Sequence, residues 1–272
     1  MDLLIKNGTI VTAKGSYMAD VAVKDGKIAE IGKNIDVSAD KVVAVNRNMA
    51  LTDAPHSPAC TIDIQVKYLD EKSKRAERIN NTIEQRIFNL QQLSMQQAVD
   101  AFVKQYADSY RENMMPLYRD DQHDTERQGW YEYQYKLGTT VTPGLNDAIV
   151  YRVELMTYEG GAHPNHQTMV MNFDADSGQL LKLNDIFVTG YEQPLCDMLL
   201  SELMRKTNSK NMDELHDKGY LMTMDLYVPD NYILGTKEVT FHYNPYEIAP
   251  YATGDTELTI SYGQLKAIMK KQ

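Results

Sequence analysis

The spacing of apolar residues changes twice along the chain, and this change limits the folds that the chain can adopt. In TIDIQVKYL, at residues 61–69, apolar and polar residues alternate, which is typical of a half-buried strand. Apolar residues then recur every three or four positions, which predicts two amphipathic helices. These two stripes are Ala76, Ile79, Ile83, Ile87 and Leu90, and then Val99, Phe102, Val103, Tyr106 and Tyr110. The order favours helices packed on a sheet.

Strand patterns return after the two helices. They occupy residues 130–141, 148–158 and 166–174, where apolar residues alternate with polar ones. Helical spacing follows at 192–208, a shorter helix is expected near 211–219, and two or three strands with a helical turn end the chain. We therefore expect an α+β fold in which an antiparallel sheet is packed with helices.

The opening of the chain has a different character. LLIKNGTIV alternates, and ADVAVKDGKIAEIG places Asp25 and Gly26 at the centre of a hairpin, where Asp-Gly favours a tight turn. The composition changes near DAPHSPA, which contains two prolines. We expect a short β-meander at 1–47, a linker at 48–60 and one α+β domain at 61–272. Three strands alone are marginally stable in water.

Composition and charge exclude some classes of protein. Hydrophobic residues make up 43% of the 272 residues, which is enough for a substantial core. The formal net charge of −10 argues against general nucleic-acid binding, which requires a basic face. An acidic surface instead suits a soluble protein, or one whose partner is basic.

The chain has no zinc-type pairing of its two cysteines, Cys60 and Cys196, and whether they form a disulfide stays open. No apolar run approaches the ~18 residues of a membrane span, so we expect no transmembrane segment. No signal peptide is visible, which fits either a cytoplasmic protein or a form whose export signal is gone.

The sequence YEGGAHPNHQ contains the most distinctive candidate site. Gly160 and Gly161 can adopt backbone angles that are closed to other residues, and Pro164 makes the connection rigid. Such a corner, residues 160–166, could present His163 and His166 for recognition, proton transfer or metal binding. The pair lacks the helical setting of known metal motifs, and no nucleophile is evident, so we favour a structural or recognition corner.

A second candidate is the tyrosine loop, residues 246–251. The chain contains 18 tyrosines and one tryptophan, and tyrosine combines a large contact area with a polar tip. Ordinary strand propensity explains many of the tyrosines. Pro245 and Pro250 stiffen this loop, so Tyr246 and Tyr251 are the better candidates for a preorganised contact surface.

Other chemical signatures are absent. The chain has no Gly-x-Ser-x-Gly elbow and no phosphate-binding loop of the GxxxxGK[ST] type. DADSGQLLKLND contains acidic residues, but Gly178 falls one position too early for a calcium-binding loop, so residues 174–178 are predicted to form a turn.

DLLIKNGTIVTA and VKDGKIAEIG resemble the first strands of dihydropyrimidinases and hydantoinases of the amidohydrolase superfamily, over about the first 45 residues. The resemblance implies a strand scaffold, followed in that family by a metal-bearing barrel that begins with a His-x-His pair. Here the next segment holds only His56, no His-x-His occurs, and the remaining length is short for such a barrel. Amidohydrolase activity is therefore disfavoured.

The glycine-histidine corner and the Asn-Pro-Tyr…Ala-Pro-Tyr-Ala stretch carry a second resemblance, over about residues 61–272. This part is similar to the extracytoplasmic domain of the lysozyme-sensing sigma-V anti-sigma factor and of related bacterial envelope lipoproteins. The resemblance implies an exported binding or sensing domain, located in the periplasm or envelope, whose partner is lysozyme or peptidoglycan.

We accordingly expect a non-catalytic envelope binding or sensing domain, with no catalytic residue, cofactor or bound metal. The candidate binding residues are Gly160, Gly161, His163, His166, Tyr246 and Tyr251. The alternative is a metal-dependent cyclic amide hydrolase, suggested by the N-terminal resemblance.

Overall fold

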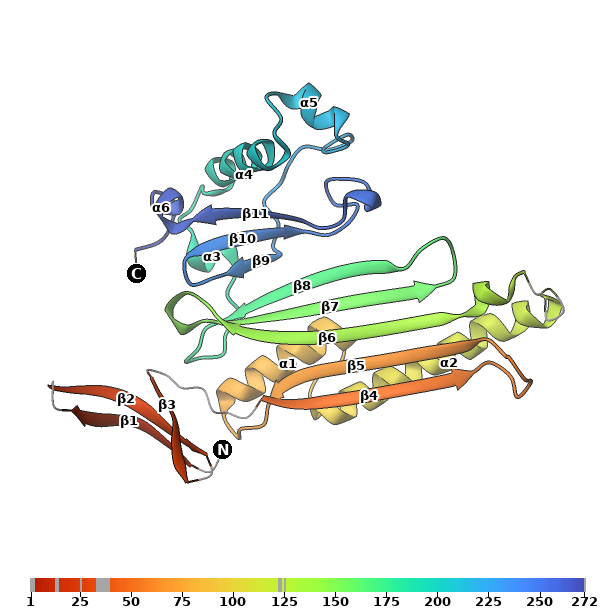
Figure 1. Ribbon diagram of the computed structural model, residues 1–272, viewed down its shortest axis with the longest axis horizontal. Coiled ribbons are helices and arrows are strands. Elements are labelled where there is room, and N and C mark those ends of the chain that lie inside the picture. Colours follow the sequence, from red (N-terminus) through yellow and green to blue (C-terminus); the bar gives the residue numbers. More distant parts are fainter. Residues whose placement is uncertain are drawn as a thin grey trace.

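The computed structural model describes residues 3–12, 15–24, 26–32, 40–121, 124 and 126–271, which form three sheets with helices around them (Figure 1). The strands are β1 Leu3–Thr12, β2 Gly15–Lys24, β3 Lys27–Gly32, β4 Asp40–Ala50, β5 Ala59–Leu69, β6 Tyr133–Pro143, β7 Ile149–Glu159, β8 Asn165–Phe173, β9 Tyr232–Leu234, β10 Glu238–Tyr243 and β11 Thr256–Ser261. The α-helices are α1 Lys74–Phe88, α2 Met95–Asp121, α3 Leu183–Ile186, α4 Glu192–Thr207, α5 Met212–Asp217 and α6 Tyr262–Leu265, and the 3₁₀ helices are η1 Gln128–Tyr131, η2 Leu145–Asp147 and η3 Tyr251–Thr253. The fold class is α+β, as expected.

The largest sheet holds five strands in the order β4, β5, β6, β7, β8. Each neighbouring pair is antiparallel except β5 and β6, which run parallel with Ile62 opposite Tyr135. The sequence predicted an antiparallel sheet, whereas this sheet is mixed. The reason is that α1 and α2 lie between β5 and β6 in the sequence. They carry the chain back to the end of the sheet at which β5 began, so β6 starts there and runs parallel to β5.

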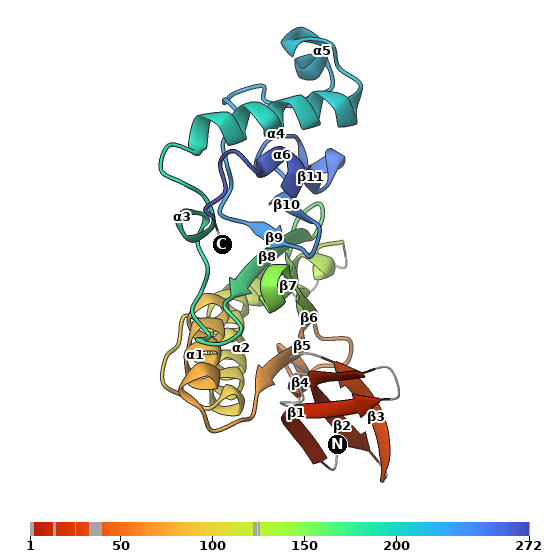
Figure 2. The same cartoon turned by 90° about the vertical axis from the view of Figure 1, so that its left-hand side faces the viewer.

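Helices α1 and α2 lie against one face of this sheet (Figure 2). The Ser73 hydroxyl accepts a hydrogen bond from the Ala76 N–H and begins α1, and Asn89 ends it in the left-handed conformation. The predicted helical stripes are confirmed, because both helices bury them against alternate residues of the strands. The fully buried residues of this core include Ile62, Ile64, Val66, Ile79, Ile83, Val99, Tyr110 and Phe173.

A second core lies beyond β8, where β9, β10 and β11 form an antiparallel sheet in the order β11, β10, β9 (Figure 1). Helix α4 packs against β11, and its predicted stripe of Leu195, Leu199 and Leu203 is fully buried. The predicted short helix near 211–219 is α5, and α6 is the closing helical turn.

The side chain of Asn172 joins the two sheets. Asn172 lies on β8, is 1% exposed, and donates from Nδ2 to the carbonyl oxygen of Tyr232 on β9 at 2.7 Å. Its Oδ1 accepts from the Leu234 N–H at 2.9 Å. The side-chain amide of Asn172 therefore makes the two hydrogen bonds to the backbone of β9 that the backbone of a neighbouring strand would otherwise make.

Asn231 makes the corresponding contact from the other side. Its Oδ1 accepts from the Val170 N–H at 2.8 Å, and its Nδ2 donates to the Thr168 carbonyl oxygen at 2.9 Å. The backbone groups on the outer edge of β8 are thereby satisfied by side chains, and the two cores are held at a defined position.

The N-terminal strands β1, β2 and β3 form a separate antiparallel sheet beyond the end of the five-stranded sheet at which β4 begins (Figure 1). The predicted hairpin joins β2 and β3, and Gly26 has a φ of 69°, in the left-handed region that glycine favours. Asp25, the other residue of the predicted turn, lies outside the described residues.

The linker expected at 48–60 is a hairpin in the structure. Strand β4 pairs with β5 along its whole length, from Asp40 opposite Leu69 to Ala50 opposite Ala59. The loop between them is closed by a hydrogen bond from the Leu51 N–H to the Pro58 carbonyl oxygen. The two prolines of DAPHSPA lie in the loop of this hairpin, because the valine-rich run at 42–45 forms a strand in which Val43 and Val45 are buried. The division of the chain into folding units stays a prediction, and the pairing suggests a boundary before Asp40.

The predicted turn at 174–178 is confirmed: Gly178 donates its N–H to the Asp174 carbonyl oxygen, and the Ser177 N–H donates to Asp174 Oδ1. The two cysteines are free. Cys60 is buried in the first core, where burial raises its pKa to about 11, and the Cys196 thiol donates to the Leu226 carbonyl oxygen.

Candidate binding site

The corner connects β7 to β8 and depends on two glycines in unusual conformations. Gly160 has a φ of 80° and Gly161 has a φ of 105°. A Cβ atom on Gly160 would lie 2.6 Å from the carbonyl oxygen of Trp130, so this glycine also allows η1 to approach closely. The Tyr158 hydroxyl donates to the Gly161 carbonyl oxygen at 3.0 Å and closes the turn.

The structure brings the corner and the tyrosine loop together. The rings of His163 and Tyr251 are stacked, with centroids 3.8 Å apart and planes 16° from parallel. Tyr246 completes the cluster, with its ring centroid 5.6 Å from that of Tyr251 and its Oη 3.5 Å from His163 Nε2. We call His163, Tyr246 and Tyr251 the aromatic platform. His163 is exposed and Tyr246 is 63% exposed, so the platform faces solvent.

Hydrogen bonds to the backbone hold the aromatic platform in place. The carbonyl oxygen of Pro164 accepts from the Tyr251 hydroxyl at 2.6 Å and lies 3.0 Å from His163 Nδ1. In the tautomer that carries a proton on Nδ1, His163 donates to this carbonyl oxygen, and its Nε2 accepts from the Tyr246 hydroxyl. One carbonyl group therefore fixes two rings of the platform.

Asn244, which begins the Asn-Pro-Tyr stretch, positions the tyrosine loop beside β8. Its Oδ1 accepts from the Thr168 N–H at 2.6 Å, and its own N–H donates to Glu247 Oε2 at 3.0 Å. Tyr246 has a φ of 72°, which is unusual for a residue with a side chain and projects its ring toward His163. The loop is thus preorganised before any partner binds.

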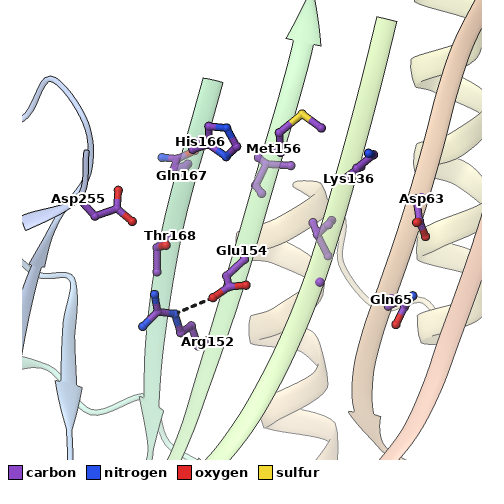
Figure 3. Close-up of a pocket in the computed structure, with 13 residues that line it drawn as sticks. Asp63, Gln65, Lys136, Arg152, Glu154, Met156, His166, Gln167, Thr168 and Asp255 are labelled. Atoms are coloured by element: carbon purple, nitrogen blue, oxygen red, sulfur yellow. Dashed lines mark ion pairs between the residues drawn. The ribbon is translucent and has the colours of Figure 1, made fainter. Parts of the chain in front are cut away.

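His166 does not join the aromatic platform. It lies on β8 and lines a separate groove of about 460 Å³ on the face of the sheet opposite the helices (Figure 3). We call this cavity the polar groove. Its lining residues are Asp63, Gln65, Lys136, Leu137, Gly138, Arg152, Glu154, Leu155, Met156, His166, Gln167, Thr168 and Asp255.

The register of the strands creates the floor of the polar groove. Asp63 on β5 is opposite Lys136 on β6, and on β7 and β8 Met156 is opposite His166. Gly138 is in the next row, and no atom lies within 4 Å of the place where its Cβ would be. The missing side chain leaves a hollow in an otherwise continuous row of polar side chains.

Arg152 organises the charges at one side of the polar groove. Its guanidinium lies 3.2 Å from Glu154 Oε1 and 3.2 Å from Glu257 Oε1, and so links β7 to β11. Burial alone would raise the pKa of Glu257, but the hydrogen bond from His242 and the charge of Arg152 hold it below its ordinary value. His242 is fully buried, with Nδ1 3.2 Å from Glu257 Oε1 and Nε2 3.6 Å from Asp255 Oδ2.

Several polar side chains in the groove have no partner among the described residues. These are Asp63, Gln65, Lys136, His166 and Gln167. Polar side chains that converge on a cavity with unused hydrogen-bonding capacity are typical of a ligand site. Sequence reasoning missed this groove, although the alternation of TIDIQVKYL already placed Asp63 and Gln65 on one polar face.

The described part of the chain has neither a cluster of metal ligands nor a membrane-spanning helix. It contains no group of three or more His, Cys, Asp or Glu side chains placed to hold a metal ion. None of its helices is long and apolar enough to cross a bilayer.

Comparison with known proteins gives a family for the C-terminal part. Residues 184–263 match the model of DUF3298, described as a protein of unknown function. The chain carries a DUF3298 domain. Tyr246 and Tyr251 of the aromatic platform lie within the matched residues, whereas His163 precedes them.

Solved structures of DUF3298 proteins share the fold over most of the chain. A crystal structure of a DUF3298 family member from Bacteroides fragilis is 28% identical, with a TM-score of 0.79, over 85% of this chain and 93% of that one. A DUF3298 family protein from Pseudomonas aeruginosa covers 85% and 94% of the two chains, with 15% identity and a TM-score of 0.61, and shows the same fold.

The curated relatives match only a short N-terminal stretch. D-hydantoinase of Geobacillus stearothermophilus is 58% identical over 43 residues, which is 16% of this chain and 9% of that protein. The chain thus spans about a tenth of the length of the curated relatives that it matches first. The predicted resemblance to hydantoinases is confirmed as a short sequence match, which lies outside the DUF3298 domain.

Proposed function

We propose that this chain is a non-catalytic binding or sensing module of the bacterial envelope that recognises a cell-wall glycan. The observation that carries the proposal is the aromatic platform, an exposed stack of His163 and Tyr251 completed by Tyr246. A sugar ring has a flat face of C–H groups, which packs on aromatic rings, and a rim of hydroxyls, which hydrogen-bond to polar side chains. The polar groove supplies such side chains nearby.

The same two chain segments carry both features. The corner leads directly into β8, which carries His166, and the tyrosine loop is followed within four residues by Asp255 of the polar groove. Both segments are fixed by hydrogen bonds before a ligand arrives, so little conformational entropy is lost on binding. The similarity of these segments to the lysozyme-sensing anti-sigma ectodomain supports an extracytoplasmic location and a sensing role.

The test is sedimentation with purified peptidoglycan and the variant Tyr251→Ala. Loss of the stacked ring is expected to weaken binding about tenfold, or about 1.4 kcal/mol. The matched control is Tyr17→Ala, since Tyr17 is a 51% exposed tyrosine on β2, far from the platform in sequence. Equal retention of both variants and the unmodified chain would contradict the proposal.

A second candidate partner is a basic protein such as lysozyme, and the net charge of −10 favours it. Binding driven by charge weakens as the salt concentration rises, whereas stacking on the platform responds little. Lysozyme capture that is strong in low salt, is lost near 0.5 M salt and is unaffected by Tyr251→Ala would favour this partner over the glycan.

The N-terminal stretch that resembles hydantoinases contributes structure to this chain and no catalysis. We assign no hydrolase activity to this chain, because the matched stretch of the bacterial D-hydantoinase is 9% of that enzyme. A dihydropyrimidine hydrolysis assay with added zinc checks this assignment, and turnover that depends on zinc bound to the purified chain would overturn it.

A further inference from the structure

The polar groove has a charge pattern that a neutral sugar chain does not explain. Asp63 and Lys136 are opposite each other on β5 and β6, yet their charged groups form no ion pair. Each has no partner among the described residues. A ligand that covers these charged groups removes their hydrating water. Unless the ligand also pairs with the charges, this loss of hydration costs binding free energy. The groove therefore favours a ligand that carries charges of its own.

The free charges in the groove have both signs. Arg152 and Glu154 pair with each other, which leaves Asp63 as a free carboxylate and Lys136 as a free ammonium group. Asp255 adds a carboxylate at the other side of the groove (Figure 3), and its Oδ2 lies 3.6 Å from Nε2 of the buried His242. A polyanion would meet two carboxylates, and a polycation would meet Lys136. A ligand with one ammonium and one carboxylate group fits both.

The width of the groove gives the length of such a ligand. It extends across four adjacent strands, from Asp63 on β5 to His166 on β8 (Figure 3). Three strand spacings amount to roughly 14 Å, which is the length of about four residues of extended peptide. The backbone amides of that peptide would meet the side-chain amides of Gln65 and Gln167, which have no partner among the described residues.

We infer that the polar groove binds a short zwitterionic peptide carried by the glycan, while the aromatic platform binds the sugar. Lys136 pairs with a carboxylate of the peptide, and either Asp63 or Asp255, at opposite sides of the groove, receives its ammonium group. This inference rests on the proposed function and specifies its ligand as a peptide-bearing glycan. Binding is non-covalent and requires no cofactor.

The experiment measures affinity of the full chain by isothermal titration calorimetry with three probes. These are soluble glycan strands with their peptides, the same strands with the peptides removed by an amidase, and the free tetrapeptide Ala-Glu-Lys-Ala. We expect the peptide-bearing strands to bind at least tenfold more tightly than the stripped strands. Lys136→Met should abolish this difference.

The matched control is Lys237→Met, which removes a charge from an exposed lysine between β9 and β10. Tyr251→Ala should weaken both kinds of strand equally. Equal affinity for the two kinds of strand would overturn the inference and leave the proposed function intact. If neither kind of glycan strand binds, the proposed function fails, and the result with the free tetrapeptide then tests the inference. Tetrapeptide binding that requires Lys136 supports the inference, and absence of tetrapeptide binding overturns it.

Discussion

At the scale of single residues, two adjacent glycines have different roles in the corner. Both have positive φ angles, but only Gly160 lies against another backbone segment, the carbonyl oxygen of Trp130. The corner thus fixes the position of η1 as well as that of His163. In another part of the fold, Arg152 and His242 both contact the Glu257 carboxylate, so this single group links β11 to β7 and β10.

Gly160→Ala and Gly161→Ala should therefore differ in stability. Each loses about 1–3 kcal/mol because a side chain is strained at a positive φ angle. Gly160→Ala loses more, since its Cβ would collide with Trp130, whereas the Cβ of Gly161→Ala would meet open space. Urea denaturation measures the two free energies of unfolding, and equal values would show that the contact with η1 does not constrain the corner.

The pKa of Glu257 predicts a pH dependence. Because the folded protein lowers this pKa, ionised Glu257 stabilises the fold above the pKa of the unfolded chain, about 4.3, and this stabilisation is lost as the pH falls through the folded value. Glu257→Gln should therefore unfold at lower urea concentration than the unmodified chain at pH 7. The two midpoints should converge below about pH 4, and a constant difference from pH 7 to pH 3 would contradict the assignment.

At the scale of elements, the molecule depends on pairings that local sequence does not reveal. Strand β8 ends the five-stranded sheet, and its outer edge is satisfied by the side chains of Asn231 and Asn244. Asn172 makes the complementary contact to β9. These amides join the five-stranded sheet to the β9–β11 sheet by side-chain hydrogen bonds, and Asn244 also fixes the tyrosine loop beside β8.

Asn172→Ala tests this junction. The substitution leaves a buried carbonyl of Tyr232 and a buried N–H of Leu234 without partners, and each costs about 1–3 kcal/mol. We expect a loss of several kcal/mol in the free energy of unfolding, measured in urea. Asn165→Ala, at an exposed position of the same strand, should change it by less than about 0.5 kcal/mol. Similar small losses in both variants would mean that the amide does not support the junction.

At the scale of the whole molecule, the N-terminal sheet and the DUF3298-like fold are two pieces with a boundary that can be tested. Strand β4 contributes Val43 and Val45 to the first core and forms the edge of the large sheet. The strands before it, β1 to β3, pair with one another. Folding of the larger piece should therefore require β4 and be independent of the residues before it.

Deletion of residues 1–39 should shift the melting temperature of the main transition by less than about 2 °C. Deletion of residues 1–50 removes β4, exposes β5 and loses two buried valines, so a drop of at least about 8 °C is expected. Thermal unfolding followed by circular dichroism distinguishes the two. Equal effects of both deletions would place the boundary elsewhere.

The sequence alone determined the elements whose apolar residues repeat regularly. The helical stripes of α1, α2 and α4 and the alternation in β5 and β7 were sufficient, because burial of one face requires these periods. It also named His163, Tyr246 and Tyr251 as candidates, since glycine, proline and clustered tyrosine are typical of rigid loops. Only the tertiary structure decided that His163 and Tyr251 stack, that β5 and β6 run parallel, and that His166 belongs to a different cavity. These facts depend on which distant segments of the chain pair with one another. The polar groove is formed by side chains of four strands, and in the sequence of any single strand those polar residues cannot be distinguished from an ordinary solvent-exposed face.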